Sequence, residues 1–296
     1  MKQATTIREQ ITLLKSRGVK IASISKAEEQ LGDIGYYRLG FYLFPFEETF
    51  PVLKKRTHKM IPKTTLDDAV ALYYFDYDIR PLLMRYANRI EIALRTYMVL
   101  TLSNKYKADP IWFVNKSVVR KEFADSFEEK CYNDIKKNPV ISRHHAKYKT
   151  DIYAPAWKTL EYMMFGNIQT LYTNLISVDD KRDISIHFGV NKTAIFENYL
   201  EIVRSLRNVC AHGGVVYDLK MPRGIKDGPA GKFGSNRQKL KGAYLVLKYL
   251  LSHVSTNRAK ELDREVKRLL KEICSKSANL KSAILATTGF EEADFS

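Results

Sequence analysis

The longest run of helical periodicity in the sequence lies between residues 66 and 107, and it constrains the fold more than any other feature. Its apolar residues recur three and four positions apart, which is the spacing of one face of an α-helix. They are Leu72, Phe75, Ile79, Leu82, Leu83, Tyr86, Ile90, Ala93, Leu94 and Tyr97. The segment therefore predicts a long helix. Pro81 is expected to kink this helix or to divide it in two, because proline lacks the amide donor that a helix interior needs.

Shorter segments with the same period predict that the whole chain is all-α. They cover residues 5–33 (as two helices), 117–138, 156–177, 180–188, 242–254 and 258–276, together with a helix that ends near residue 214. Three prolines interrupt residues 45–63, so a loop or a short hairpin is expected there. This organisation predicts a small N-terminal helical and aromatic extension, residues 1–62, and a helical domain, residues 63–296. The acidic tail 291–294 is expected to be frayed.

The N-terminal extension contains a dense aromatic cluster whose role the sequence leaves open. Aromatic side chains beside basic residues can stack on nucleic-acid bases. Such a cluster is more often a packed core or a docking surface, and we favour that interpretation. Its members are Tyr36, Tyr37, Phe41, Tyr42, Phe44, Phe46 and Phe50.

The net charge of +16 favours an acidic partner, and nucleic acid is the first candidate. A generally basic soluble protein is the alternative. The three cysteines show neither a metal-binding spacing nor a disulfide framework, which favours a reducing cytoplasm and no metal or other cofactor. No run of 18 apolar residues and no signal-like segment occurs, so we expect a cytoplasmic protein without a membrane span.

Residues 199–214 place Arg207, Asn208 and His212 at the end of an apolar helix. Arg207 continues the line of apolar residues formed by Phe196, Leu200 and Val203, so it is expected to point into the apolar arc. A buried guanidinium is costly unless it is paired or held for use. The arginine and the histidine lie roughly 140° apart on an ideal helix. They can converge only if the helix ends at the following glycine pair, which suits a left-handed cap.

Residues 219–241 form a basic, glycine-rich segment directly after this helix. Its cations could hold a phosphate backbone, and we favour RNA contact over the alternative of a disordered surface loop. They are Lys220, Arg223, Lys226, Lys232, Arg237, Lys239 and Lys241.

The segment Arg207-Asn208-Val-Cys-Ala-His212 resembles the R-x4-6-H motif of HEPN-domain ribonucleases. The longer segment that starts at Leu206 resembles the Abi-like abortive-infection proteins of bacteria. Three further blocks resemble the same family in the same order, so that the resemblance spans roughly residues 7 to 252. These blocks are Gly35-Tyr-Tyr-Arg-Leu39, Leu72–Arg80 with Ile90–Arg95, and Pro155-Ala-Trp157 followed by Glu161 and Phe165-Gly166. Val215 departs from the family, which often has a basic residue there, so an auxiliary phosphate contact is not expected at that position.

The resemblance implies a HEPN-like helical bundle and a metal-independent endoribonuclease of a phage-defence system. His212 would transfer protons, because histidine is suited to this near neutral pH. Arg207 would stabilise the phosphorane, and Asn208 would orient the histidine or bind a phosphate oxygen. Glu91 could orient Arg207; the alternative is a solvent-facing pair between Glu91 and Arg95, four residues apart.

The chain has one motif histidine, whereas cleavage needs both a base and an acid, so the resemblance implies a homodimer that shares a composite site. Two other classes remain open. The chain could be a non-catalytic RNA-binding protein that forms a ribonucleoprotein with a small regulatory RNA. It could also serve mainly as the partner of a nucleotidyltransferase.

Overall fold

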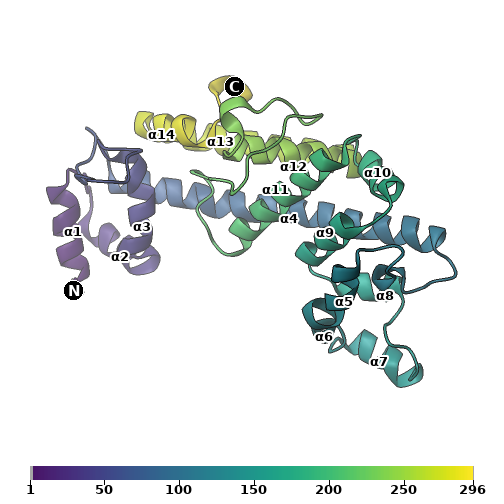
Figure 1. Ribbon diagram of the computed structural model, residues 1–296. Coiled ribbons are helices and arrows are strands. Elements are labelled where there is room, and N and C mark those ends of the chain that lie inside the picture. The colour runs from purple at the N-terminus through teal and green to yellow at the C-terminus, as the bar shows by residue number, and fades with distance from the viewer. Residues whose placement is uncertain (1–2, 296) are drawn as a thin grey trace.

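The computed structural model describes residues 3–295, and the fold in this range is all-α with no named strand, as predicted. One helix, α4 (Leu66–Lys105), runs through the molecule as its spine (Figure 1). It is one continuous helix of 40 residues, so the expectation that Pro81 would divide it is wrong. The missing amide of Pro81 would have bonded to the carbonyl of Tyr77, which lies on an exposed turn where water can replace it.

The start of α4 is fixed by a reciprocal cap that the sequence encodes locally. The Thr65 hydroxyl accepts a hydrogen bond from the Asp68 amide at 3.0 Å, and the Asp68 carboxylate accepts one from the Thr65 amide at 2.9 Å. Such a capping box satisfies two amides that a helix start leaves without partners. The other oxygen of Asp68 accepts a hydrogen bond from the Ser277 hydroxyl at 2.7 Å, which ties α4 to the C-terminal helices.

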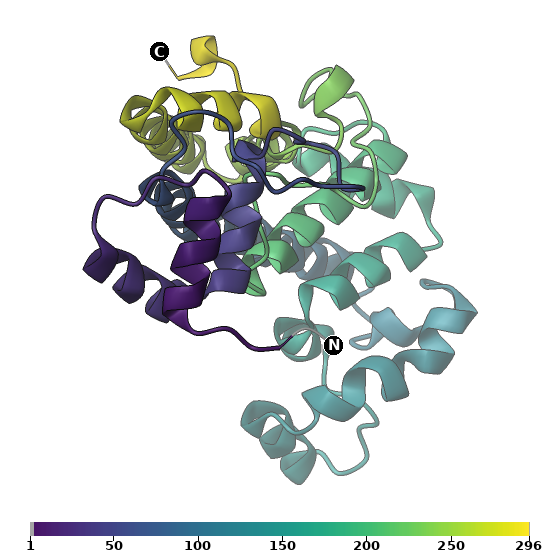
Figure 2. The ribbon, with the colours of Figure 1, turned by 90° about the vertical axis from the view of Figure 1, so that its left-hand side faces the viewer.

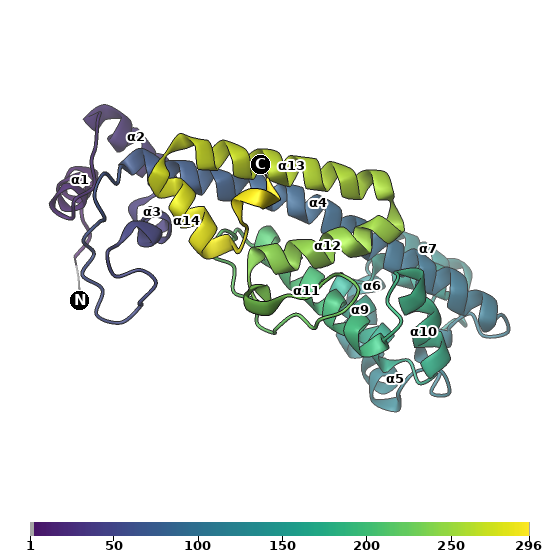
Figure 3. The same ribbon diagram turned by 90° about the horizontal axis from the view of Figure 1, so that it is seen from above.

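Three C-terminal helices cover one side of α4: α12 (Leu240–Val254), α13 (Thr256–Lys276) and α14 (Ala278–Thr288). Helix α13 lies along α4, and α12 runs back beside α13 (Figure 3). Helix α14 was not predicted from the sequence. The acidic tail is ordered, contrary to expectation. It forms a short 3-10 turn in which Asp294 pairs with Lys241 at 2.8 Å, and Phe290 is buried.

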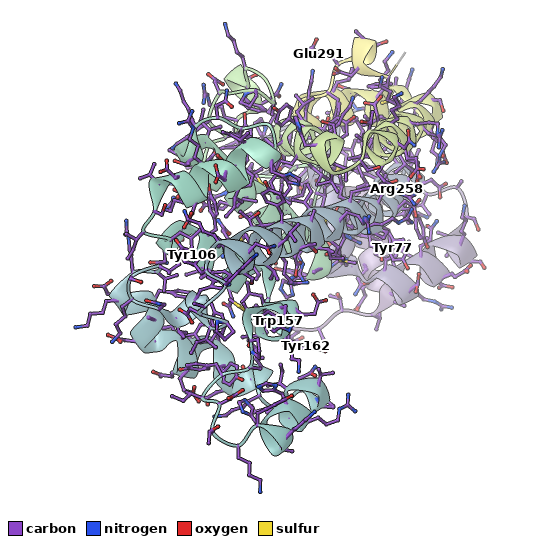
Figure 4. The ribbon with its side chains drawn as sticks, turned by 90° about the vertical axis from the view of Figure 1, so that its right-hand side faces the viewer. Tyr77, Tyr106, Trp157, Tyr162, Arg258 and Glu291 are labelled. Atoms are coloured by element: carbon purple, nitrogen blue, oxygen red, sulfur yellow. The ribbon has the colours of Figure 1, made fainter. Side chains whose placement is uncertain are left out.

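An adjoining side of α4 carries α9 (Phe165–Asn174), α10 (Val178–His187) and α11 (Thr193–Ala211), and α11 also packs against α12. Helix α11 packs on α4 along much of its length. Helix α10 is tied to the end of α4 by Tyr106, labelled in Figure 4, whose hydroxyl donates to Asp180 at 2.6 Å. The segment 156–177 is not one helix, because α8 (Ala156–Thr159) and a 3-10 turn (Leu160–Tyr162) precede α9.

A group of short helices lies below the spine in Figure 1: α5 (Lys121–Phe127), α6 (Asn133–Ile135) and α7 (Pro139–Lys147). A turn of π-helix, Glu128–Tyr132, joins the first two. This region corresponds to the charged helix predicted for residues 117–138. Its buried aromatic side chains, among them Phe127 and Tyr132, anchor it to the core.

The N-terminal helices α1 (Ile7–Ser16), α2 (Ile24–Ile34) and α3 (Tyr36–Leu43) form the other end of the molecule (Figure 2). The two helices predicted for residues 5–33 are confirmed. The members of the aromatic cluster differ in burial. Tyr42 is fully buried, as the packed-core interpretation expects, whereas Tyr37 is 82% exposed. The buried residues of this end and of the remaining helices belong to one continuous core. The division at residues 62 and 63 stays a prediction. No helix in the described range is both long enough and apolar enough to cross a membrane.

Candidate functional site

The helix that carries the Arg–Asn–His motif ends where the sequence predicts. Helix α11 stops at Ala211, His212 is its C-terminal cap, and Gly213 has a left-handed φ of 65°. The Gly214 amide bonds to the Val209 carbonyl at 2.8 Å, and the Gly213 amide bonds to the Cys210 carbonyl at 3.3 Å. These two bonds form a Schellman motif, which requires a residue that tolerates positive φ. The glycine pair thus stops the helix and leaves His212 at its end.

The motif corner, by which we mean Arg207, Asn208 and His212, lies at the surface. Asn208 and His212 are exposed, and Arg207 is half-buried. The Arg207 guanidinium donates to the Asn208 side-chain oxygen at 3.2 Å. Arg207 therefore lies at the margin of the apolar arc, and the expectation that it points into the arc is met in part. Its Nε atom is fully covered and has no hydrogen-bond partner among residues 3–295.

The chain that leaves the corner, residues 213–217, which we call the exit segment, is held by a buried carboxylate. Asp76 on α4 is fully buried and accepts hydrogen bonds from the amides of Val216 at 2.9 Å and Tyr217 at 2.7 Å. Arg80, one turn further along α4, donates to the Gly214 carbonyl at 3.1 Å and lies 3.5 Å from Asp76. A buried ion pair on α4 thus fixes the backbone directly after His212.

Burial has a measurable consequence for this carboxylate. Removal from water raises the pKa of Asp76 to about 6, although the amides of Val216 and Tyr217, Arg80 and the Tyr42 hydroxyl all favour the charged form. The Tyr42 hydroxyl donates to Asp76 at 3.1 Å. Burial thus disfavours the charged form of Asp76, while hydrogen bonds from two backbone amides and the Tyr42 hydroxyl stabilise it.

A second arginine reaches the exit segment from the N-terminal helices. Arg38 on α3 donates to the Gly213 carbonyl at 2.7 Å, and its guanidinium lies 5.8 Å from the centre of the Tyr73 ring. Arg38 belongs to the Gly35–Leu39 block, and Asp76 and Arg80 belong to the Leu72–Arg80 block. Two blocks that carry the family resemblance therefore meet directly after the motif corner. The sequence did not predict that their side chains bind this backbone, because nothing local in the sequence joins residue 76 to residue 216.

Glu91 lies elsewhere. It accepts a hydrogen bond from Arg95 at 2.8 Å, and Arg95 also donates to the Met163 carbonyl at 3.0 Å. Both side chains of this pair are largely buried, at 13% and 10% exposure, so the expectation of a solvent-facing pair is wrong. The hydrogen bond to Arg207 that an orienting role for Glu91 would need is not formed in the described part of the chain.

The basic loop, residues 219–241, is ordered, so the alternative of a disordered loop is wrong. It runs back along α11: the Lys226 amide donates to the Asn198 side chain at 2.8 Å, and the Ala230 amide donates to the Tyr199 hydroxyl at 3.3 Å. Ile225 and Phe233 anchor it in the core. Because α11 rises about 1.5 Å per residue, Asn198 is roughly 20 Å from His212. The loop therefore lies beside the motif helix, as predicted, but mostly away from the motif corner.

Most cations of the basic loop already have partners. Arg223 pairs with Glu201 at 3.3 Å, Arg237 pairs with Asp227, and Lys220 lies 3.6 Å from Asp218. The ammonium groups of Lys226 and Lys239 each donate to a backbone carbonyl at 3.3 Å. The structure ends the loop at Lys239, because α12 begins at Leu240; Lys241 therefore lies in the first turn of α12, where it is paired with the acidic tail. Among the seven predicted cations, Lys232 shows neither kind of contact within the described residues.

A pocket of about 420 Å³ opens between α3, the loop that follows it and residues 215–220. Tyr36, Phe41 and Phe44 line it on one side, and Tyr217 lines it on the other. The pocket thus adjoins the far side of the exit segment, and its volume would admit a small molecule.

The fold and the corner together define an all-α protein that presents a polar Arg–Asn–His set at the exposed end of one helix. The family model described as Abi-like protein matches residues 29–218, which is more than half of the chain, and the chain therefore belongs to the Abi-like family. The matched range contains Arg38, Asp76, Arg80 and the motif corner. No curated protein and no solved structure matched the chain. Membership of this family points to abortive infection, a bacterial defence against phage.

Proposed function

We propose that this protein is a metal-independent endoribonuclease of the HEPN class, acting in a bacterial phage-defence system. The observation that carries the proposal is the motif corner. Arg207, Asn208 and His212 stand at the exposed end of α11, and the backbone after them is bound by Arg38, Asp76 and Arg80. Three buried or half-buried side chains, from helices that lie far from α11 in the sequence, bind one surface turn. Burying charged groups costs free energy, but these contacts hold the turn rigidly, as an active site requires.

The chemistry that suits these side chains is in-line attack of the ribose 2′-OH on the adjacent phosphorus. A base removes the 2′-OH proton, the 2′-oxygen bonds to phosphorus, and the bond to the 5′-oxygen breaks as an acid protonates that oxygen. Histidine can serve in either proton transfer, and the arginine fork can bind the charge that develops on the phosphorane. The products are a 2′,3′-cyclic phosphate and a 5′-OH. DNA is not cleaved, because it lacks the nucleophile.

A second copy of the chain supplies the second proton-transfer group in this proposal. Asn208 and His212 are both exposed, so a second copy can approach them without any rearrangement of α11. The composite site of a homodimer then contains two arginines and two histidines, one histidine acting as base and the other as acid.

The experiment is a cleavage assay on labelled RNA in EDTA with purified protein that has been stripped of nucleic acid. The wild type is expected to produce cyclic-phosphate ends. Arg207→Ala and His212→Ala are each expected to lose at least about a hundredfold in rate. A positioned acid or base contributes about 10² to 10⁴, and a donor that stabilises developing charge contributes about 10² to 10³. Arg143→Ala is the matched control, since Arg143 is exposed on α7, far along the chain from the motif.

Two outcomes would contradict the proposal. If wild type and variants all bind RNA and none cleaves it, the alternative of a non-catalytic RNA-binding protein in a ribonucleoprotein replaces it. If the rate per chain stays constant on dilution to concentrations at which the protein is monomeric, the composite dimer site is wrong.

A further inference from the structure

A second arginine of α11 shares the exposed face of this helix with the motif corner. Arg204 lies roughly 60° around the helix from Arg207 and roughly 80° from His212, so it falls between them in projection. Like Arg207, it is half-buried, and its Nε atom is covered without a hydrogen-bond partner among the described residues. It packs against Gly166 at the start of α9. Its place next to the corner is therefore well defined.

The two arginines on this face have no carboxylate partner among residues 3–295. The carboxylate three residues before Arg204, on Glu201, is paired with Arg223, and Glu197 is paired with Lys181. Neither Arg204 nor Arg207 has an ion-pair partner in the range 3–295. Like charges three residues apart on a helix repel each other. An anion bound between the two guanidinium groups would offset this repulsion.

Arg204 also lines a groove of about 490 Å³ between α9, α11 and the basic loop. Gln169 from α9 and Arg223 and Lys226 from the loop are among its lining residues. Two carboxylates of α11, Glu197 and Glu201, also line it, and each is paired with a cation. Gln169 is only 8% exposed, and its side-chain oxygen is covered without a partner. Of the five side-chain atoms of this kind between residues 3 and 295, three belong to Arg204, Arg207 and Gln169. Unpaired polar atoms are thus concentrated where α9 meets α11.

We propose that this α11 groove binds the sugar–phosphate backbone of the RNA beside the scissile bond, and that Arg204 binds the phosphate next to the one held at the motif corner. The strand then continues past Gln169 toward Arg223 and Lys226. The unpaired side-chain oxygen of Gln169 can accept a hydrogen bond from a ribose hydroxyl. The inference rests on the proposed function for the position of the scissile bond, but binding in the groove is a separate property.

The test measures binding without cleavage. A fluorescent 2′-O-methyl oligonucleotide cannot be cleaved, because its 2′-oxygen carries no proton. Its Kd is measured by anisotropy over a range of salt concentrations for the wild type, Arg204→Ala and Arg143→Ala. Loss of one phosphate contact is expected to reduce the slope of log Kd against log salt by about 0.7 and to weaken binding about fivefold at 0.1 M salt. Arg143→Ala removes the same charge elsewhere and is expected to match the wild type.

The outcomes separate the groove from the nuclease. If Arg204→Ala equals Arg143→Ala in both Kd and salt slope, the groove proposal is overturned, whether or not the wild type cleaves RNA. If Arg204→Ala shows the expected loss while the wild type does not cleave, the groove stands and the nuclease proposal falls. Arg204→Lys keeps the charge and is expected to restore most of the salt slope. If Arg204→Ala does not fold, as judged by circular dichroism, Arg204→Gln takes its place in the comparison.

Discussion

The motif corner lies at the end of α11, and the basic loop packs against the same helix. Both regions contain cations, but the loop cations are mostly paired within the chain and the arginine of the corner is not. In the loop, Arg223 and Arg237 are paired with carboxylates, and these pairs help to order the chain. At the corner and beside it, Arg204 and Arg207 have no carboxylate partner among the described residues. The number of positive charges therefore does not locate a binding surface. The cations that the fold leaves uncompensated are the better indicator.

The supports of the two regions differ as well. The loop is held by apolar side chains such as Ile225 and Phe233 and by hydrogen bonds to Asn198 and Tyr199 on α11. The exit segment is held by hydrogen bonds to Asp76, Arg80 and Arg38. The ion pair between Asp76 and Arg80 is buried, whereas the pairs that Arg223 and Arg237 form in the loop lie at the surface.

The largest effect should follow from removal of the buried carboxylate. Asp76→Ala leaves the amides of Val216 and Tyr217 and the charge of Arg80 buried without their partner. Breaking a buried pair in this way costs about 3–5 kcal/mol of unfolding free energy, which urea denaturation measures. Cleavage should be lost together with stability. Asp134→Ala is the control, since it removes an exposed pair with Lys137 and should leave the urea midpoint unchanged. An equally small effect of Asp76→Ala would show that the corner does not depend on this support.

A smaller effect should appear as pH changes. The pKa of Asp76 is about 6 in the folded protein and near 3.8 in the unfolded chain, so between these values the folded state binds more protons at this site. Through this group, folding stability therefore increases as the pH falls from 6 to 4, by at most about 3 kcal/mol. Because Asp76→Asn cannot titrate, the wild type should gain stability relative to this variant as the pH is lowered. A relative loss over the same range would show that the fold favours the charged carboxylate.

The smallest effect should come from the loop. Arg237→Ala removes a cation that Asp227 already compensates, so the Kd for the 2′-O-methyl oligonucleotide should change less than about twofold, compared with about fivefold for Arg204→Ala. Anisotropy measured on the two variants side by side tests the contrast between paired and unpaired cations. If Arg237→Ala weakens binding as much as Arg204→Ala does, pairing within the chain is no guide to RNA contact, and the comparison fails.

Patterns that span only a few residues predicted much of this structure. The all-α class, the long helix over residues 66–107 and the end of α11 at its glycine pair are all confirmed, because periodicity and left-handed caps are local properties. The order in the acidic tail and in the basic loop was not predicted. Both depend on partners far away in sequence, such as Lys241 for the tail and Asn198 for the loop.

What the sequence by itself determined is the all-α class with most of its long helices, the family, and the place of Arg207, Asn208 and His212 at the end of one helix. What only the tertiary structure decided is which charges are neutralised. In the tertiary structure Asp76 accepts hydrogen bonds from residues 216 and 217, and Glu91 pairs with Arg95. Arg204 lies next to the corner with no carboxylate partner among the described residues. The physical reason is that helix formation depends on neighbours three and four positions away, whereas the partner of a charge is chosen by packing between helices that lie far apart in the chain.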